Sequence, residues 1–224
     1  AIDQASADQV QLAQARGTLW NGSAQLVLTG GGASQDRAAL PGRIVWQLRP
    51  TWSGLRAQLH AACCTDSALQ LQVKLRWGGA QLTLADSQSQ WPAAVLAGLG
   101  TPWNTLQPQG QLQLRTTHLQ ADWAAGRMVL SGQAQLDALA MSSRLSTVAP
   151  MGSYRFELQG GEVPTLTLQT LEGSLQLSGS GQWVGQRLRF AGEASAAPER
   201  QAALANLLNL IGRRSGARSL ITLG

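Results

Sequence analysis

The chain has 224 residues, of which 44% are hydrophobic, 13% are charged and 5% are aromatic. This composition excludes a disordered, acidic, Pro-rich chain, and the length allows a sizeable core. The net charge is +5, but the Arg residues are scattered and form no run interleaved with aromatic residues, which argues against a nucleic-acid partner. No apolar run approaches the roughly 18 to 20 residues of a membrane-spanning helix. The chain begins without Met, so we expect a processed or truncated fragment, and if the protein has a signal or an anchor, we expect it upstream.

The first sixty residues predict two hairpins. Apolar and polar residues alternate on both sides of the segment GTLWNG, residues 17–22, which is typical of two strands and a turn. Residues 29–39 are polar and rich in Gly, and therefore predict a loop. Alternation resumes in 44–48 and 55–61, with a turn at Trp52–Gly54.

The two cysteines are adjacent, at Cys63 and Cys64. Neighbouring side chains on a strand point to opposite faces, so a bond between them requires a distorted turn, and residues 65–67 are suited to one. A disulfide in an oxidising compartment and two reduced thiols, one of them buried, are both compatible with the sequence. We expect no metal site, because only His60 is near and tetrahedral ligands are lacking.

Residues 68–85 give the cleanest hairpin pattern, and residues 86–90 close it. The character then changes, since Pro92 followed by an Ala-rich segment predicts a short helix over 92–99. Pro102 and Pro108 predict an irregular connector. We therefore expect an N-terminal β lobe at 1–90, a connector at 91–108 and a C-terminal β lobe at 109–224, with one continuous domain as the alternative.

The C-terminal half predicts further strands and one helix. The alternation of 112–123 breaks phase near Thr117 and His118, which indicates a β-bulge. Strand patterns follow at 127–139, 153–159 and 165–171, and then in the hairpin 171–192. Residues 197–211 have helical spacing of Leu and Ile, Pro198 in the first turn and Gly212 as a stop. We expect this amphipathic helix to plug one open end of the sheet, with a membrane surface or a partner as the alternative.

Tryptophan marks the reversals of the predicted hairpins. Five tryptophans lie within three positions of a glycine that we expect in a hairpin turn, and they are Trp20, Trp52, Trp77, Trp123 and Trp183. Trp183 is in phase with the Leu face of its hairpin, so we interpret it as a core or rim side chain, with a stacking platform for sugar or lipid as the alternative. The fold expected is all-β: antiparallel hairpins curled into one or two half-open, barrel-like sheets, with the two helices added.

The sequence offers no arrangement typical of catalysis. The two histidines, His60 and His118, lie outside any nucleophile motif, and the carboxylates are isolated along the chain. The Gly-rich segment that begins at Gly30 lacks the Lys of a phosphate-binding loop. We therefore expect no enzyme activity and no cofactor.

Four segments in this order resemble the periplasmic part of type II secretion system protein N. They are GTLWNG at 17–22, the Cys63-Cys64-Thr65 element, WPAAVLAGLGTPWNTLQPQG at 91–110 and NLLNLIGRRSGARSLITLG at 206–224. The resemblance covers nearly the whole chain. It implies the periplasmic domain of a single-pass inner-membrane protein whose anchor is missing here, with an accessory role in export. It also makes a disulfide between Cys63 and Cys64 more credible, because the periplasm is oxidising.

The partners implied are other subunits of the secretion apparatus, namely the inner-membrane platform and the outer-membrane secretin. As partner surface we predict one face of the C-terminal helix and the basic residues after it: Leu204, Leu208, Ile211, Arg213, Arg214 and Arg218. The alternative function is a lipid-binding groove. Residues 171–179 have the pattern L-x-G-x-L-x-L-x-G, similar to envelope proteins of the AsmA type.

Overall fold

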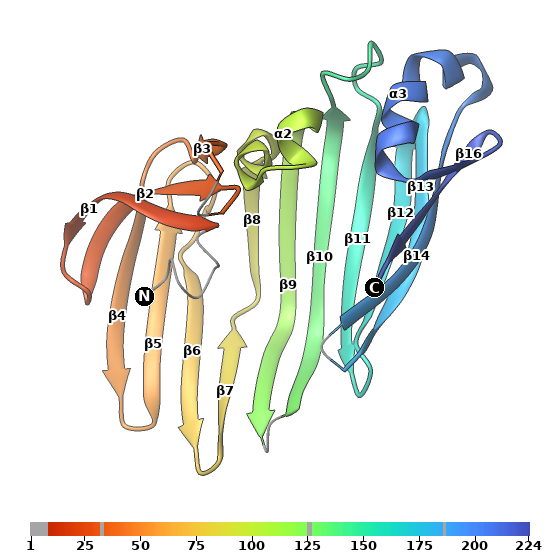
Figure 1. Cartoon of the computed structure of the whole chain (residues 1–224). Coiled ribbons are helices and arrows are strands. Elements are labelled where there is room, and N and C mark those ends of the chain that lie inside the picture. The colour runs from red at the N-terminus through yellow and green to blue at the C-terminus, as the bar shows by residue number, and fades with distance from the viewer. Residues whose placement is uncertain (1–8, 32–33, 125–126, 186) are drawn as a thin grey trace.

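The computed structural model describes residues 9–31, 34–124, 127–185 and 187–224, which form one antiparallel sheet of sixteen strands with short helices along one edge (Figure 1). The strands are β1 (Val10–Gly17), β2 (Asn21–Thr29), β3 (Arg37–Ala39), β4 (Ile44–Thr51), β5 (Gly54–Ala61), β6 (Leu69–Arg76), β7 (Gly79–Leu84), β8 (Ser87–Pro92), β9 (Gln109–Ala124), β10 (Arg127–Ser142), β11 (Gly152–Gly161), β12 (Thr165–Gly173), β13 (Leu175–Val184), β14 (Arg187–Ala196), β15 (Arg213–Ser215) and β16 (Arg218–Leu223). The helices are the 3₁₀-helices η1 (Ala93–Leu99) and η2 (Pro198–Arg200) and the α-helices α2 (Trp103–Leu106) and α3 (Gln201–Ile211).

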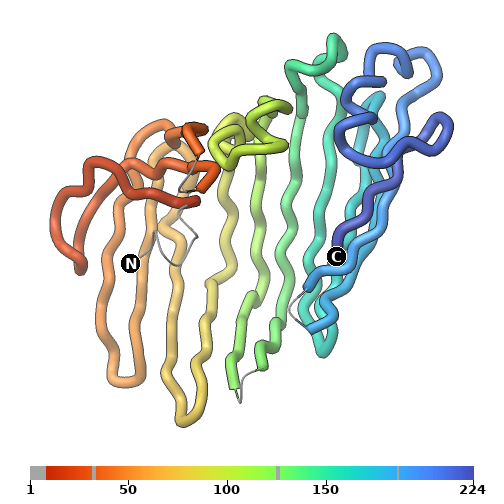
Figure 2. The backbone as a smooth tube through the Cα atoms, viewed as in Figure 1, coloured from red at the N-terminus to blue at the C-terminus, as the bar shows by residue number. Residues whose placement is uncertain are grey.

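The sheet is a meander in which strands adjacent in the chain are mostly adjacent in space. The order runs from β1 through β2, β4 to β7 and β9 to β14, and ends with β16 and β15; β3 pairs with β2, and β8 pairs with β9. The sheet does not close into a barrel, so the predicted all-β, half-open architecture is confirmed. Figure 2 shows how its two ends curl out of the plane of the middle strands.

Alternation with a period of two gives the sheet one apolar and one polar face, because successive side chains on a strand point to opposite sides. Apolar residues stand opposite apolar residues across many strands, for example Val73 opposite Leu82 and Leu136 opposite Phe156. On the other face Gln72 stands opposite Thr83. Because the strands are in register, the apolar side chains of each strand pack against those of the neighbouring strands on the same face of the sheet.

Two apolar clusters lie on this sheet. The first joins Ile44, Ala61 and Cys64 with Val95 of η1, and partly buried leucines of β1 and β2 pack against it. The second is larger and contains residues of β10 to β14 together with three leucines of α3. Hydrogen bonds between β7 and β9 continue the sheet past residues 91–108. The division into lobes at 1–90, 91–108 and 109–224 stays a prediction.

A bulge interrupts the pairing of β9 with β10, where the sequence breaks phase. Ser131 pairs with Gln120, but Gln133 pairs with Thr117, so β9 contains an extra residue at His118 and Leu119. His118 has a φ of 50°. The carboxylate of Asp86 accepts a hydrogen bond of 2.6 Å from the His118 backbone amide. Asp86, in the loop before β8, thus stabilises the bulge.

Several short elements differ from the prediction. β3 lies within the predicted loop 29–39, part of which is outside the described residues, and β8 lies where residues 86–90 were expected only to close a hairpin. The predicted helix at 92–99 is a 3₁₀-helix, and α2 lies in the predicted connector. β15 and β16 occupy the C-terminal segment. β3, β15 and α2 have only three or four residues each, which is too short to give a clear periodicity in sequence.

Candidate functional site

The two histidines lie on the surface in separate places. His60 Nδ1 is 3.0 Å from the hydroxyl of Thr65, and His118 Nε2 is 4.0 Å from a carboxylate oxygen of Asp86. Within the described ranges, no three side chains of His, Cys, Asp or Glu gather to hold a metal ion. The absence of enzyme activity and of a cofactor stays a prediction.

Cys63 and Cys64 are joined by a disulfide in the turn between β5 and β6. Cys64 is buried in the N-terminal apolar cluster, whereas Cys63 is exposed. The Thr65 hydroxyl accepts a hydrogen bond of 3.0 Å from the amide of Ala61. The turn is therefore tied both to the core and to the end of β5.

The predicted partner surface on the C-terminal helix requires a correction. Leu204 and Leu208 are 0% and 1% exposed, and Ile211 packs beside them against the C-terminal cluster. The face is apolar because the helix covers its own sheet, as the expected plug for one end of the sheet implies. Leu204 and Leu208 are thus core residues and are not available to a partner, and Ile211 is partly buried beside them.

Arg213, Arg214 and Arg218 are exposed at the C-terminal end of the sheet, on β15 and β16. Arg218 forms an ion pair of 3.1 Å with Glu193 on the neighbouring β14. Among the described residues, Arg213 and Arg214 have no ion pair. These arginines mark the last strands of the open sheet, and their role as partner surface stays a prediction.

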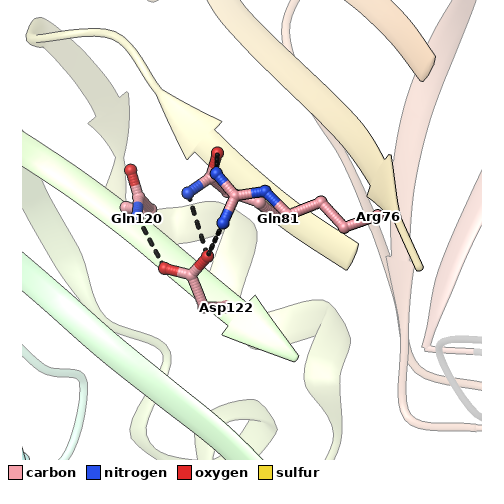
Figure 3. A network of polar contacts seen from close by, with 4 residues as sticks. All are labelled: Arg76, Gln81, Gln120 and Asp122. Carbon is pink, nitrogen blue, oxygen red and sulfur yellow. Dashed lines mark hydrogen bonds and ion pairs between the residues drawn. The ribbon is translucent and has the colours of Figure 1, made fainter. Parts of the chain in front are cut away.

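A polar network on the sheet connects β6, β7 and β9 (Figure 3). Asp122 accepts hydrogen bonds of 2.9 Å from Gln81 and 2.6 Å from Gln120. Arg76 donates to Gln81 at 3.1 Å and lies 3.9 Å from Asp122. Each of the four side chains forms a hydrogen bond or an ion pair with another of the four. The network therefore stabilises strand pairing and leaves Asp122 little capacity to bind a ligand.

The hairpins reverse along the edge of the sheet opposite the helices, which is the lower edge in Figure 1. We call this edge, formed by the β4–β5, β6–β7, β9–β10, β11–β12 and β13–β14 reversals, the tip edge. Trp52 and Trp77 stand at two of its tips and are fully exposed, at 108% and 107%. The pattern of Trp beside Gly indicated turns correctly, but the exposure of these two rings was not anticipated. Trp183 is half-buried, and the turn glycine Gly126 lies outside the described residues.

Near the last tip is a hollow of about 800 Å³. Its wall combines polar side chains with apolar ones, and the residues are Thr165, Thr167, Ser180, Gln182, Arg187, Arg189, Phe190, Ala191, Thr222 and Leu223, with two glycines. The wall contains one Leu and no Trp. This hollow is therefore not the groove lined by Leu and Trp faces that the lipid-binding alternative describes.

The helices were also compared with the length of a membrane span. In the parts of the chain that the structure describes, none is both long and apolar enough to cross a bilayer.

Comparison with known proteins gives one match. The family model described as type II secretion system (T2SS), protein N, matches residues 8–220. No curated protein and no solved structure matches the chain.

Proposed function

Because the chain belongs to the family of type II secretion system protein N, it is a component of the type II secretion apparatus, and we propose that it serves there as a periplasmic, non-catalytic scaffold subunit. The docking surface we propose is the C-terminal end of the sheet, formed by β15 and β16. The partners are other subunits of the apparatus, in the inner-membrane platform or the outer-membrane secretin.

The observation that carries this proposal is the incomplete pairing of β16. Residues 218–220 pair with β14 on one side and with β15 on the other, whereas among the described strands residues 221–223 pair with β14 alone. Backbone groups of 221–223 that point away from β14 are available to another strand. An exposed strand edge is a template for strand addition by a partner.

The charges beside this edge favour an acidic partner. Arg213 and Arg214 are exposed directly after the end of α3. The charge of Arg218 is only partly neutralised by Glu193. Leu223 adds an exposed apolar side chain at 58%. This surface is complemented by an extended segment of a secretion subunit in which acidic residues, opposite the arginines, lie next to an apolar residue, opposite Leu223.

The disulfide supports the placement in the periplasm. Disulfides persist in oxidising compartments and are rare in the cytosol. The Cys63–Cys64 bond lies in a turn that is packed against a core cluster, so the oxidised form is compatible with the folded sheet.

The test is photo-crosslinking in cells from position 222. Thr222 is exposed on β16, and a matched control position is Gln169, which is exposed in the middle of the sheet on β12. We expect a crosslinker at position 222 to capture another secretion subunit and one at position 169 to capture none. Reversal of charge in R213E/R214E should reduce the crosslinked product and the exported protein together.

Two results would contradict the proposal. One is equal capture from positions 222 and 169. The other is normal export in cells that lack the protein, which would remove a scaffold role altogether.

A further inference from the structure

We propose that the tip edge is a membrane-contact surface, which places Trp52 and Trp77 in the headgroup region of an anionic phospholipid bilayer. This inference rests on other residues than the C-terminal docking surface, because Trp52 and Trp77 stand at the β4–β5 and β6–β7 reversals, which are far from β16 in the strand order. It rests on the exposure of the tryptophans, the charge beside the tips and the shape of the edge.

The tryptophans are the first observation. At 108% and 107% exposure, the rings of Trp52 and Trp77 contact almost nothing in the chain. Neither indole has a hydrogen-bond partner among the described residues, whereas the indoles of Trp46 and Trp91 do. A Trp side chain has a large apolar body and a polar N–H, and it is enriched where membranes meet water.

The charges are the second observation. Within three residues of the five reversals the sequence has seven basic residues and two acidic ones. The basic residues are Arg49, Arg56, Lys74, Arg76, Arg127, Arg187 and Arg189; the acidic ones are Asp122 and Glu162. Asp122 is already occupied by the network of Figure 3. The edge is therefore strongly positive and attracts a negatively charged surface.

Arg49 and Arg56 show this excess most directly. They are cross-strand partners on β4 and β5, both are exposed, and neither has an ion pair within the described ranges. Two like charges directly opposite each other destabilise a sheet. Phosphate groups of a bilayer would relieve this repulsion by accepting hydrogen bonds from both guanidinium groups.

The apolar face adds to the contact. Leu75, Trp123 and Met128 lie in one row across β6, β9 and β10 near the tips, and they are 65%, 42% and 55% exposed. Lys74 and Arg76 alternate with Leu75, so the basic residues lie on the other face. The edge is thus amphipathic, with apolar tips and one apolar side.

The shape of the edge favours a bilayer over a protein segment. The basic residues are distributed over four hairpins along the edge rather than gathered in a pocket. Reversals of hairpins offer no unpaired strand for strand addition.

The experiment measures sedimentation of the chain with vesicles of phosphatidylglycerol and phosphatidylcholine in equal parts, and with vesicles of phosphatidylcholine alone. We expect binding to the anionic vesicles that weakens as salt is added. R49Q/R56Q should reduce the binding constant about thirty-fold, since each basic residue near an anionic surface contributes about five-fold. W52A/W77A should reduce it by on the order of ten-fold or more.

Trp103→Ala is the matched control, because Trp103 is a partly exposed tryptophan on α2, at the helix-bearing edge. It should bind as the wild type does, as should R213Q/R214Q. Quenching of tryptophan fluorescence by brominated lipid should be strong in the wild type and largely lost in W52A/W77A. Thermal unfolding checks that each variant is folded, and the tips are exposed enough to tolerate these changes.

Three outcomes would overturn the proposal. They are equal binding to neutral and anionic vesicles, unchanged binding of W52A/W77A, and no vesicle binding at all. Capture of an acidic protein through a crosslinker at position 77, without vesicle binding, would assign the edge to a protein partner instead.

Discussion

Arg155 on β11 forms a two-pronged ion pair with its cross-strand partner Asp137 on β10. Nε donates to Oδ1 at 2.7 Å and Nη2 donates to Oδ2 at 2.9 Å. The Asp137 side chain is only 14% exposed. This geometry is the strong form of a carboxylate–guanidinium contact, and it links the middle of the sheet.

We predict that this ion pair makes the free energy of unfolding depend on pH in the acidic range. Hydrogen bonds from the Arg155 guanidinium hold the pKa of Asp137 below its usual value, and burial opposes this effect without cancelling it. A lowered folded pKa gives stability that is present above the unfolded pKa, near 4, and that is lost as the pH falls through the folded pKa. Asp137→Asn should lower the free energy of unfolding at neutral pH by about 1–3 kcal/mol. Urea unfolding at several pH values should show a shallower acid slope for the variant; parallel curves would contradict this.

Replacement of Tyr154 by Phe should not destabilise the folded protein. The ring of Tyr154 is 5% exposed in the C-terminal cluster, its hydroxyl has no hydrogen-bond partner in the described structure, and burial raises its pKa. Tyr154→Phe removes an unsatisfied polar group, so the free energy of unfolding should stay equal or rise by about 1 kcal/mol. Tyr154→Ala should lower it by about 3–5 kcal/mol because a cavity remains. A clear loss of stability in Tyr154→Phe would show that the hydroxyl has a partner.

The role of α3 as a core element can be tested by truncating its leucines. Leu204→Ala or Leu208→Ala should each lower the free energy of unfolding by about 2–5 kcal/mol, because both side chains are fully buried. Leu210 on the same helix is 42% exposed, so Leu210→Ala should change it by about 0.5 kcal/mol or less. Denaturant unfolding distinguishes the variants. Equal effects at positions 208 and 210 would mean that the helix does not pack as described.

The bulge in β9 predicts a requirement for glycine at position 132. Gly132 has a φ of 85°, and a Cβ there would collide with the backbone oxygen of His118. Gly132→Ala should therefore lower the free energy of unfolding by about 1–3 kcal/mol or more. Gly161 is the control, because a Cβ at this position meets only one atom, at 3.9 Å. Thermal unfolding in which both Ala variants melt together would argue against the bulge.

Much of the fold follows from local pattern. Alternation with a period of two identified the long strands and their hairpins, because one face of each is buried. The helical spacing and Pro198 identified the C-terminal helix, and the loss of phase near His118 identified the bulge. Shorter elements, such as β3 and β15, escaped because three residues carry no measurable period.

The sequence by itself thus determined that each strand has one apolar and one polar face, and where the hairpins turn, since both features depend on neighbouring residues. Only the tertiary structure decided which apolar side chains are covered. Leu208 and Trp77 are both large apolar side chains, yet Leu208 is buried between its own helix, α3, and the sheet, whereas Trp77 is fully exposed at a hairpin tip. Burial is set by contacts between segments far apart in the chain, and these depend on how the open sheet curls. The antiparallel meander also brings basic residues from four hairpins to one edge, which no single segment reveals.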